Sequence, residues 1–260
     1  MQNRYVGDVG DFGKYGLLRA LCMPDGDKYP ALRLGVVWYL TSDETHNNDG
    51  RHIGYLEPTP KNLQAFRACD PSLYDNLGEI VRSGDRSVSA IRRKGILPED
   101  TIYYERILDL KGNRIRSKPS SRVLERQEWV AGALESTQTC HVVFVDPDNG
   151  IGTMAQAYSR LGSKYVLLEE LLPYYDRGQT LVIYHHLNRQ ATAEIQIEER
   201  LTQARQQVGV SAQVMALRYR RGSPRVFYIL TKDTTVMEVL DKTLARFADV
   251  PWCEHFVKVN

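Results

Sequence analysis

Cysteine is scarce in this sequence, and long apolar runs are absent. The four cysteines include no Cys-x-x-Cys pair, so their spacing argues against a zinc motif and against a disulfide framework. No apolar run approaches the roughly 18 residues that a membrane-spanning helix needs. Residues 1–11 hold no apolar stretch typical of a signal peptide. We therefore expect reduced thiols and a cytoplasmic protein without a membrane partner.

Neither sign of charge dominates. The 34 Lys and Arg residues nearly balance the 32 Asp and Glu residues, which gives a net charge of +2. Overall charge therefore neither favours nor excludes a nucleic-acid partner, and such a site would need a local basic patch. A hydrophobic content of 42% is ordinary for a globular protein. We expect residues 1–260 to form a single α/β domain, and nothing in the sequence indicates its oligomeric state.

Apolar runs of strand length alternate with segments of helical periodicity. The expected strands are 34–40, 102–105, 142–145 and 180–184, and the expected helices are 14–23, 61–82, 121–134, 163–175, 190–207 and 235–247. Continuous apolar runs are typical of strands that are covered on both faces. Strands separated by helices predict parallel pairing, and hence a doubly wound sheet.

The pattern changes towards the end of the chain. Residues 214–219 and 225–230 alternate with a period of two, and a turn at 221–224 joins them. This pattern is typical of a β-hairpin rather than of a crossover. The expected fold is therefore α/β, with a Rossmann-like, doubly wound, mostly parallel sheet and a C-terminal antiparallel hairpin. Within it we expect a glycine-rich N-terminal arm at residues 1–16 and a helical insertion at 42–100.

Each of the four expected parallel strands ends in polar residues. Ligands of open parallel sheets bind beyond the carboxyl ends of the strands. The sharpest cluster is Asp146-Pro147-Asp148-Asn149, where the proline restricts Asp146 to extended backbone and holds its carboxylate as a stiff acceptor. The alternative interpretation of this cluster is plain turn chemistry, because each of its residues favours turns. The other strand ends are Thr41-Ser42-Asp43, Glu105, and Tyr184-His185-His186, which leads to Arg189.

The segment Gly7–Gly16 is rich in glycine and leads into a helix. It is either a loop that approaches a ligand closely or an arm that packs on the sheet. It is not a phosphate-binding Walker loop, because Tyr15 replaces the required Ser or Thr and no strand precedes it. Lys14 lies at the expected start of the helix, where the helix dipole disfavours a cation. This placement indicates a ligand or a carboxylate partner close to Lys14.

Two basic segments are candidates for contact with phosphates. One is the loop at 111–122 with Arg116, and the other is the hairpin, where Arg221 has aromatic neighbours. Solvated strand faces carry the same residue types, so that interpretation stays open. His185 and His186 point to opposite faces if their strand continues, so at most one of them is expected to face the site.

In this order the motifs resemble those of the bacterial large-subunit ribosomal RNA adenine-N6 methyltransferases, which have the class I S-adenosylmethionine-dependent fold. The family's N-terminal helix start resembles Gly10–Tyr15, with its lysine at Lys14. Its first strand end resembles Leu40–Asp43, and its second acidic strand end corresponds to Glu105. Its Asp-Pro-Pro-Tyr motif aligns with residues 146–149, where Asp148 and Asn149 replace the second proline and the tyrosine. A later strand of the family resembles 180–184 followed by 188–190.

The resemblance implies a methyltransferase that uses S-adenosylmethionine and acts on RNA or DNA, with an adenine amino group as a target. The implied cofactor-binding residues are Lys14, Thr41, Ser42, Asp43 and Glu105. The implied catalytic residues are Asp146, Pro147, Asp148 and Asn149, and the implied substrate-binding residues are Tyr184, His185, Arg189, Arg116 and Arg221. Because the motif lacks its tyrosine, Tyr184 or Phe12 would have to supply the platform for an unstacked base.

Two other functions fit the same residues. Asp146 and Asp148, with Asp8, Asp11 or Asp43, would hold Mg²⁺ through oxygen ligands in a phosphoesterase or nuclease. A non-catalytic member of the fold would instead use the same edge of the sheet to bind a nucleotide or a partner protein. A response to S-adenosylmethionine, to Mg²⁺ alone or to neither separates the three hypotheses.

Overall fold

The computed structural model describes residues 1–23, 32–44, 48–110, 119–209, 213–249 and 251–259. Over these ranges a seven-stranded sheet has the order β2-β1-β3-β6-β8-β7-β9. Its strands are β1 (Leu34–Trp38), β2 (Ile102–Tyr104), β3 (Val142–Asp146), β6 (Thr180–His186), β7 (Gln213–Tyr219), β8 (Arg225–Thr231) and β9 (Phe256–Val259). A separate two-stranded sheet pairs β4 (Gly150–Ile151) with β5 (Tyr165–Val166).

The first four strands of the sheet pair in parallel, in the order β2, β1, β3 and β6. Strand β8 lies antiparallel between β6 and β7, so the last strand of the hairpin is the inner one. Strand β9 joins the outer edge antiparallel to β7. The expected α/β fold, with a largely parallel central sheet and a terminal antiparallel hairpin, is confirmed at this level.

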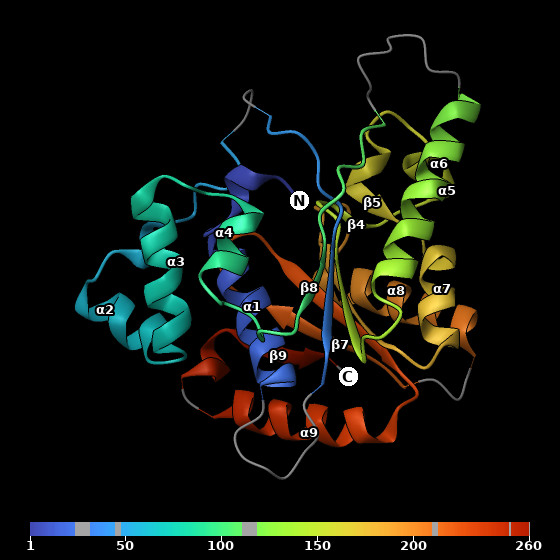
Figure 1. Cartoon of the computed structure of the whole chain (residues 1–260). Helices are drawn as coiled ribbons and strands as arrows, with labels where there is room; N and C mark the ends of the chain where they lie inside the picture. Colours follow the sequence, from blue (N-terminus) through green and yellow to red (C-terminus); the bar gives the residue numbers. More distant parts are fainter. Residues whose placement is uncertain (24–31, 45–47, 111–118, 210–212, 250, 260) are drawn as a thin grey trace.

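Helices cover both faces of the sheet (Figure 1). One face carries α1 (Val9–Cys22), α3 (Pro71–Ser83) and α4 (Val88–Arg93), and α9 (Thr234–Ala248) packs beside α1. The opposite face carries α5 (Pro119–Ser136), α7 (Leu168–Asp176) and α8 (Ala193–Val208). Alternate residues of β1 enter the two cores, with Val36 and Trp38 on one side and Val37 on the other. That division explains the continuous apolar run of this strand.

The glycines of the N-terminal segment pack α1 closely against the sheet. Gly10, Gly13 and Gly16 are three residues apart and share one face of the helix. A Cβ atom at Gly10 would lie 2.7 Å from Arg225, and one at Gly13 would lie 2.7 Å from the ring of Tyr219. Both distances are shorter than any ordinary carbon contact. These glycines therefore serve the packing of α1, which agrees with the interpretation of the segment as an arm that packs on the sheet.

Several boundaries differ from the expected ones, and each has a local cause. Helix α1 begins at Val9 rather than at Lys14, because the carboxylate of Asp8 caps it by accepting from the Gly10 amide. Residues 61–82 are not one helix, since Pro71 starts α3 after a short α2 (Pro60–Asn62) and a π-helical turn (Leu63–Arg67). Ser163 does not cap a helix, because the pairing of β5 with β4 keeps the next residues extended.

Two expectations from composition have a structural counterpart. The four cysteines are free thiols. Among the helices that the structure describes, none is both long and apolar enough to cross a membrane. Gly178, at φ +86°, follows α7 in the left-handed region that glycine favours after the end of a helix.

Candidate functional site

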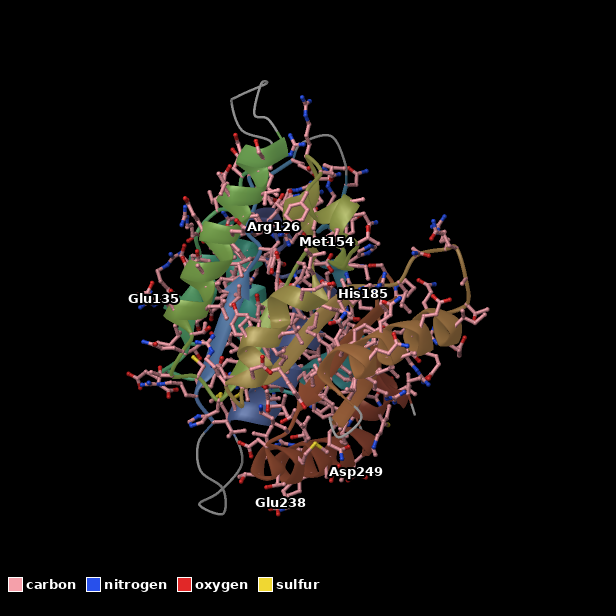
Figure 2. All side chains as sticks on the ribbon, turned by 90° about the vertical axis from the view of Figure 1, so that its right-hand side faces the viewer. Arg126, Glu135, Met154, His185, Glu238 and Asp249 are labelled. Atoms are coloured by element: carbon pink, nitrogen blue, oxygen red, sulfur yellow. The ribbon has the colours of Figure 1, made fainter. Side chains whose placement is uncertain are left out.

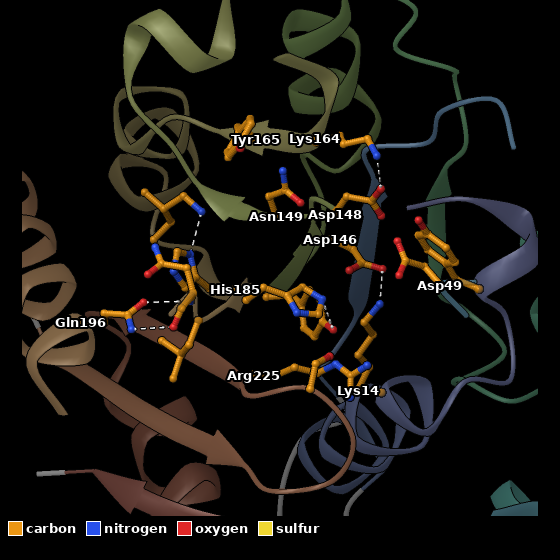
Figure 3. A pocket seen from close by; sticks show the side chains of 18 of the residues that line it. Lys14, Asp49, Asp146, Asp148, Asn149, Lys164, Tyr165, His185, Gln196 and Arg225 are labelled. Atoms are coloured by element: carbon orange, nitrogen blue, oxygen red, sulfur yellow. Dashed lines mark hydrogen bonds and ion pairs between the residues drawn. The ribbon is translucent and has the colours of Figure 1, made fainter. Parts of the chain in front are cut away.

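A cavity of about 800 Å³ opens at the carboxyl ends of β3 and β6. Its wall is formed by the start of α1, the segment after β3, the β4–β5 pair, the end of β6, one side of α8 and the start of β8 (Figure 3). The volume lies within the range that small-molecule sites occupy. The position agrees with the rule that parallel sheets bind ligands beyond their carboxyl ends.

The floor of the cavity contains a buried lysine between two carboxylates. Asp146 ends β3 and is 1% exposed. The Nζ atom of Lys14 lies 2.9 Å from Oδ2 of Asp146 (Figure 3). The same atom lies 3.3 Å from Oδ1 of Asp11. It also lies 4.2 Å from the ring centre of Tyr184, within the range of a cation–π contact. Of the two predicted partners of Lys14, a ligand or a carboxylate, the carboxylate is present.

The environment of this cluster shifts the pKa values of two of its members. Burial disfavours the charged form of Lys14, but the carboxylates of Asp146 and Asp11 outweigh it and raise the pKa of the ammonium. Burial also raises the pKa of Asp11 to about 6, although the charge of Lys14 opposes this shift. At neutral pH the cluster therefore keeps a permanent cation.

Asp8 and Arg225, the first residue of β8, form a second buried ion pair in the cavity wall. The carboxylate of Asp8 accepts from Nη2 of Arg225 at 2.9 Å and from the Gly10 amide at 3.0 Å. Both partners are almost fully buried. The Nε atom of Arg225 has no hydrogen-bond partner among the described residues. Helix α1 thus contributes one charged side chain per turn to the cavity, at Asp8, Asp11 and Lys14.

The segment after β3 is tied down by a further set of charges. Asp148 lies 3.1 Å from the N-terminal ammonium of Met1 and 3.5 Å from Lys164, which also pairs with Glu44 at 2.9 Å. Burial opposes ionisation of Asp148, but the two ammonium groups outweigh it and lower its pKa. Met1 also bonds through its backbone to Tyr39 and Thr41, so it covers the end of β1.

Arg126 of α5 holds the outer wall of the cavity in place. It is buried, and its guanidinium donates to Glu170 and to the carbonyl oxygens of Gly162 and Tyr165. In Figure 2, which faces α5, α7 and α8, Arg126 and His185 lie within the body of the molecule. The segment that carries β5 is therefore anchored on both sides, by Arg126 and by Lys164.

The two histidines at the end of β6 are both neutral. Nδ1 of His185 accepts from the Ile151 amide at 3.0 Å, and a ring nitrogen of His186 lies 2.9 Å from the hydroxyl of Tyr184. Burial lowers the pKa of each histidine to about 3. The expectation that at most one of them faces the site is wrong, because the cavity wraps around the strand end and both line it.

The remaining predicted residues divide between the cavity and other parts of the molecule. Asp146, Asp148, Asn149, Lys14, Tyr184 and His185 line the cavity, and the buried Pro147 joins two of them. Thr41, Ser42, Asp43, Glu105, Arg189 and Arg221 are described but are not part of its wall. Arg116 lies outside the described residues.

Two of the outlying residues have structural partners instead. Arg221 forms an ion pair with Glu254 at 2.9 Å and lies over the ring of Phe66. Phe12, expected as a stacking platform, packs against Trp252 in the core, with ring centres 5.2 Å apart. It therefore cannot receive a base, and that expectation is wrong. Tyr184 lines the cavity, but Lys14 already covers its ring.

Lys164, Gln196 and Arg200 line the cavity but were not singled out from the sequence. Lys164 lies in a short turn, and the other two lie in the polar helix α8, where such residues are usual. No group of three or more His, Cys, Asp or Glu side chains in the described ranges is placed to hold a metal ion. At the floor, Lys14 already bridges Asp11 and Asp146, where a Mg²⁺ ion would need their oxygens.

Fold and site together define an α/β protein with a cavity lined by charged residues at the ends of its strands. Comparison with protein-family models, with curated proteins and with solved structures found no match to this chain. The function therefore has to be argued from the cavity itself.

Proposed function

We propose that the protein is an S-adenosylmethionine-dependent methyltransferase that acts on an amino group of a nucleic acid. Two features support this. The antiparallel strand β8 inserted between β6 and β7 agrees with the class I methyltransferase sheet that the motif order resembles. The observation that carries the proposal is the Asp146-Pro147 step on the cavity floor, where the family's motif holds its target amino group.

The cavity offers a donor set that fits the cofactor, whereas the end of β1 does not. At that end, the backbone of Met1 already forms hydrogen bonds with the Tyr39 carbonyl oxygen and with the Thr41 amide. Within the cavity, Lys164 and Asp148 would exchange their present partners, Glu44 and the Met1 ammonium, for the cofactor's carboxylate and ammonium. Tyr165 and Ile151 would face its adenine. When bound, S-adenosylmethionine supplies an electrophilic methyl group. A volume of about 800 Å³ also leaves space for a base.

Asp146 is held as a hydrogen-bond acceptor for the incoming amino group. Its Oδ2 atom is fixed by Lys14, and Oδ1 makes no hydrogen bond with any residue in the described ranges. The extended backbone before Pro147 restricts the carboxylate further. An acceptor fixed in this way orients the amino nitrogen, and direct transfer depends on positioning more than on a strong base.

Asp146→Asn tests the proposal. The mutation keeps the shape of the side chain but removes the charge, and we expect methyl transfer from labelled S-adenosylmethionine to RNA or DNA to fall about 10²–10³-fold. Asp146→Ala is a poorer test, because Asp146 is buried and Lys14 would lose its nearest partner.

Glu105→Gln is the matched control for the position of the cofactor. Glu105 follows β2 and is not part of the cavity wall, so the variant should bind S-adenosylmethionine as the wild type does. Isothermal titration calorimetry measures both variants, and circular dichroism checks that they are folded. Absence of any heat with S-adenosylmethionine, or full activity of a folded Asp146→Asn protein, would refute the proposed function.

A further inference from the structure

Two side chains that line the cavity, His185 and Arg200, have hydrogen-bond donors or charge that their neighbours do not fully use. His185 is 7% exposed and lines the cavity. Because its Nδ1 accepts from the Ile151 amide, its proton must lie on Nε2. Nε2 makes no hydrogen bond to any other residue that the structure describes. The ring lies directly against the backbone of Gly150, where an added Cβ atom would be only 2.2 Å from Nδ1.

Arg200 of α8 lines the same cavity. Its Nη1 atom donates to the neutral amide oxygen of Gln203 at 2.6 Å. Among the described residues, no carboxylate lies within ion-pair distance of its guanidinium, whereas Arg205, one turn further along the helix, pairs with Glu198. Both residues line one cavity, and burial and then the positive charge of Arg200 lower the pKa of His185.

The loop between His185 and Arg200 is fixed by a single side chain. Gln196 uses its amide nitrogen to donate to the carbonyl oxygens of Asn188 and Ala191, and its oxygen accepts from the Asn188 amide. The ring of Tyr228 packs edge-on against His185, with ring centres 5.6 Å apart. His185 is therefore held by its surroundings before any ligand arrives, which lowers the cost of binding.

We propose that His185 and Arg200 form a subsite for a phosphate group. The Nε2–H group of His185 and the guanidinium of Arg200 can only donate hydrogen bonds, so the subsite favours ligands with acceptor oxygens. The unpaired charge of Arg200 favours an anion. A guanidinium binds two oxygens of a phosphate at once and leaves a third for the imidazole N–H, whereas a carboxylate has only two. In the proposed methyltransferase, this subsite would bind a phosphate of the substrate. The biological role of the subsite therefore rests on the proposed function.

Calorimetric titration of the full-length protein with inorganic phosphate at low ionic strength tests the subsite. Loss of a charge-assisted contact should weaken phosphate binding about tenfold in Arg200→Gln. His185→Asn should weaken it several-fold, because asparagine keeps an acceptor for the Ile151 amide but loses the Nε2 donor. Arg205→Gln, on the same helix but outside the cavity wall, should bind phosphate as the wild type does.

Two further titrations identify the ligand. AMP should bind about tenfold more tightly than adenosine if the phosphate is a monoester, and a short single-stranded RNA should bind more tightly than AMP if it is a diester of the backbone. The proposal is overturned if Arg200→Gln binds phosphate as the wild type does, or if acetate at the same ionic strength gives the same response.

The subsite and the proposed function can fail separately. Phosphate binding that requires Arg200, in a protein that gives no heat with S-adenosylmethionine, would keep the subsite and refute the methyltransferase. Methyl transfer by a protein whose phosphate binding is indifferent to Arg200 would refute the subsite alone.

Discussion

Replacement of Lys14 by methionine removes the cation from the centre of the cavity floor. Methionine has a similar length and is apolar, so the change isolates the charge rather than the packing. The ammonium of Lys14 lies between Asp146 and Asp11, and all three side chains are buried. In the variant, two buried carboxylates face each other without a counter-ion.

The loss of stability can be bounded from the distances. At an effective dielectric constant of about 20, separations of 2.9 and 3.3 Å correspond to gross attractions of ~6 and ~5 kcal/mol. Part of this is returned, because the lysine no longer has to be desolvated. Removal of one partner of a buried ion pair usually lowers the free energy of unfolding by about 3–5 kcal/mol, and we expect a value in that range at pH 8.

The pH dependence of this difference has a defined sign. Burial raises the pKa of Asp11 to about 6, even though the charge of Lys14 lowers it. In Lys14→Met that pKa rises further above the value of the unfolded chain, near 4. A carboxyl group with a raised folded-state pKa contributes most stability below the unfolded value and loses it as the pH rises. The difference between wild type and variant should therefore be largest at pH 8 and should shrink towards pH 5.

Urea unfolding followed by circular dichroism at pH 8 and pH 5 measures both quantities. Lys94→Met is the matched control, because Lys94 forms an ion pair with Glu79 at 2.6 Å while the two side chains are 42% and 53% exposed. Its loss should cost about 0–1 kcal/mol at either pH. The reasoning is wrong if Lys14→Met loses no more stability than this control, or if the difference grows as the pH falls.

Two other predictions concern packing and acid stability. Gly16→Ala should lower the free energy of unfolding, measured by thermal melts, by about 1–3 kcal/mol, because its Cβ would collide with Trp252. Gly54→Ala is the control and should change that free energy little, because the nearest atom to its Cβ would be 4.0 Å away. His185 and His186 keep pKa values of about 3, below those of the unfolded chain, so their imidazole NMR signals should not titrate between pH 8 and pH 5. Their contribution to stability is present above about pH 6.5 and is lost on acidification below it; a titration midpoint near pH 6.5 in the folded protein would contradict their burial.

The parts of the site that the sequence predicted are those with a local cause. The apolar run of β3 and the Asp146-Pro147 step are neighbours in the chain, so strand, acceptor and cavity floor follow from a few residues. Lys14 was expected to have a ligand or a carboxylate as its partner because of its place at a helix start. In the structure that helix begins at Val9 instead. Lys14 still pairs with a carboxylate, because a buried ammonium group needs a partner wherever it lies in a helix.

The parts that the sequence could not predict depend on contacts between distant segments. Met1 covers the end of β1 through backbone bonds to Tyr39 and Thr41, and backbone bonds leave no trace in residue type. Arg200 lies in a helix with a polar surface, where arginine is usual. Ser163 is a good cap by residue type, but the pairing of β5 with β4 prevails over that local preference.

The glycine motif and the Asp-Pro motif belong to one arrangement. An ion pair of 2.9 Å between Lys14 and Asp146 requires α1 to lie at a fixed distance from the sheet. Gly10 and Gly13 set that distance, because they let Arg225 and Tyr219 lie directly against the helix backbone. A side chain at either position would push α1 outwards and separate the lysine from the carboxylate. The charges at the cavity floor are therefore oriented before a ligand binds, and fixed charges of this kind stabilise a reacting group without reorganisation during the reaction.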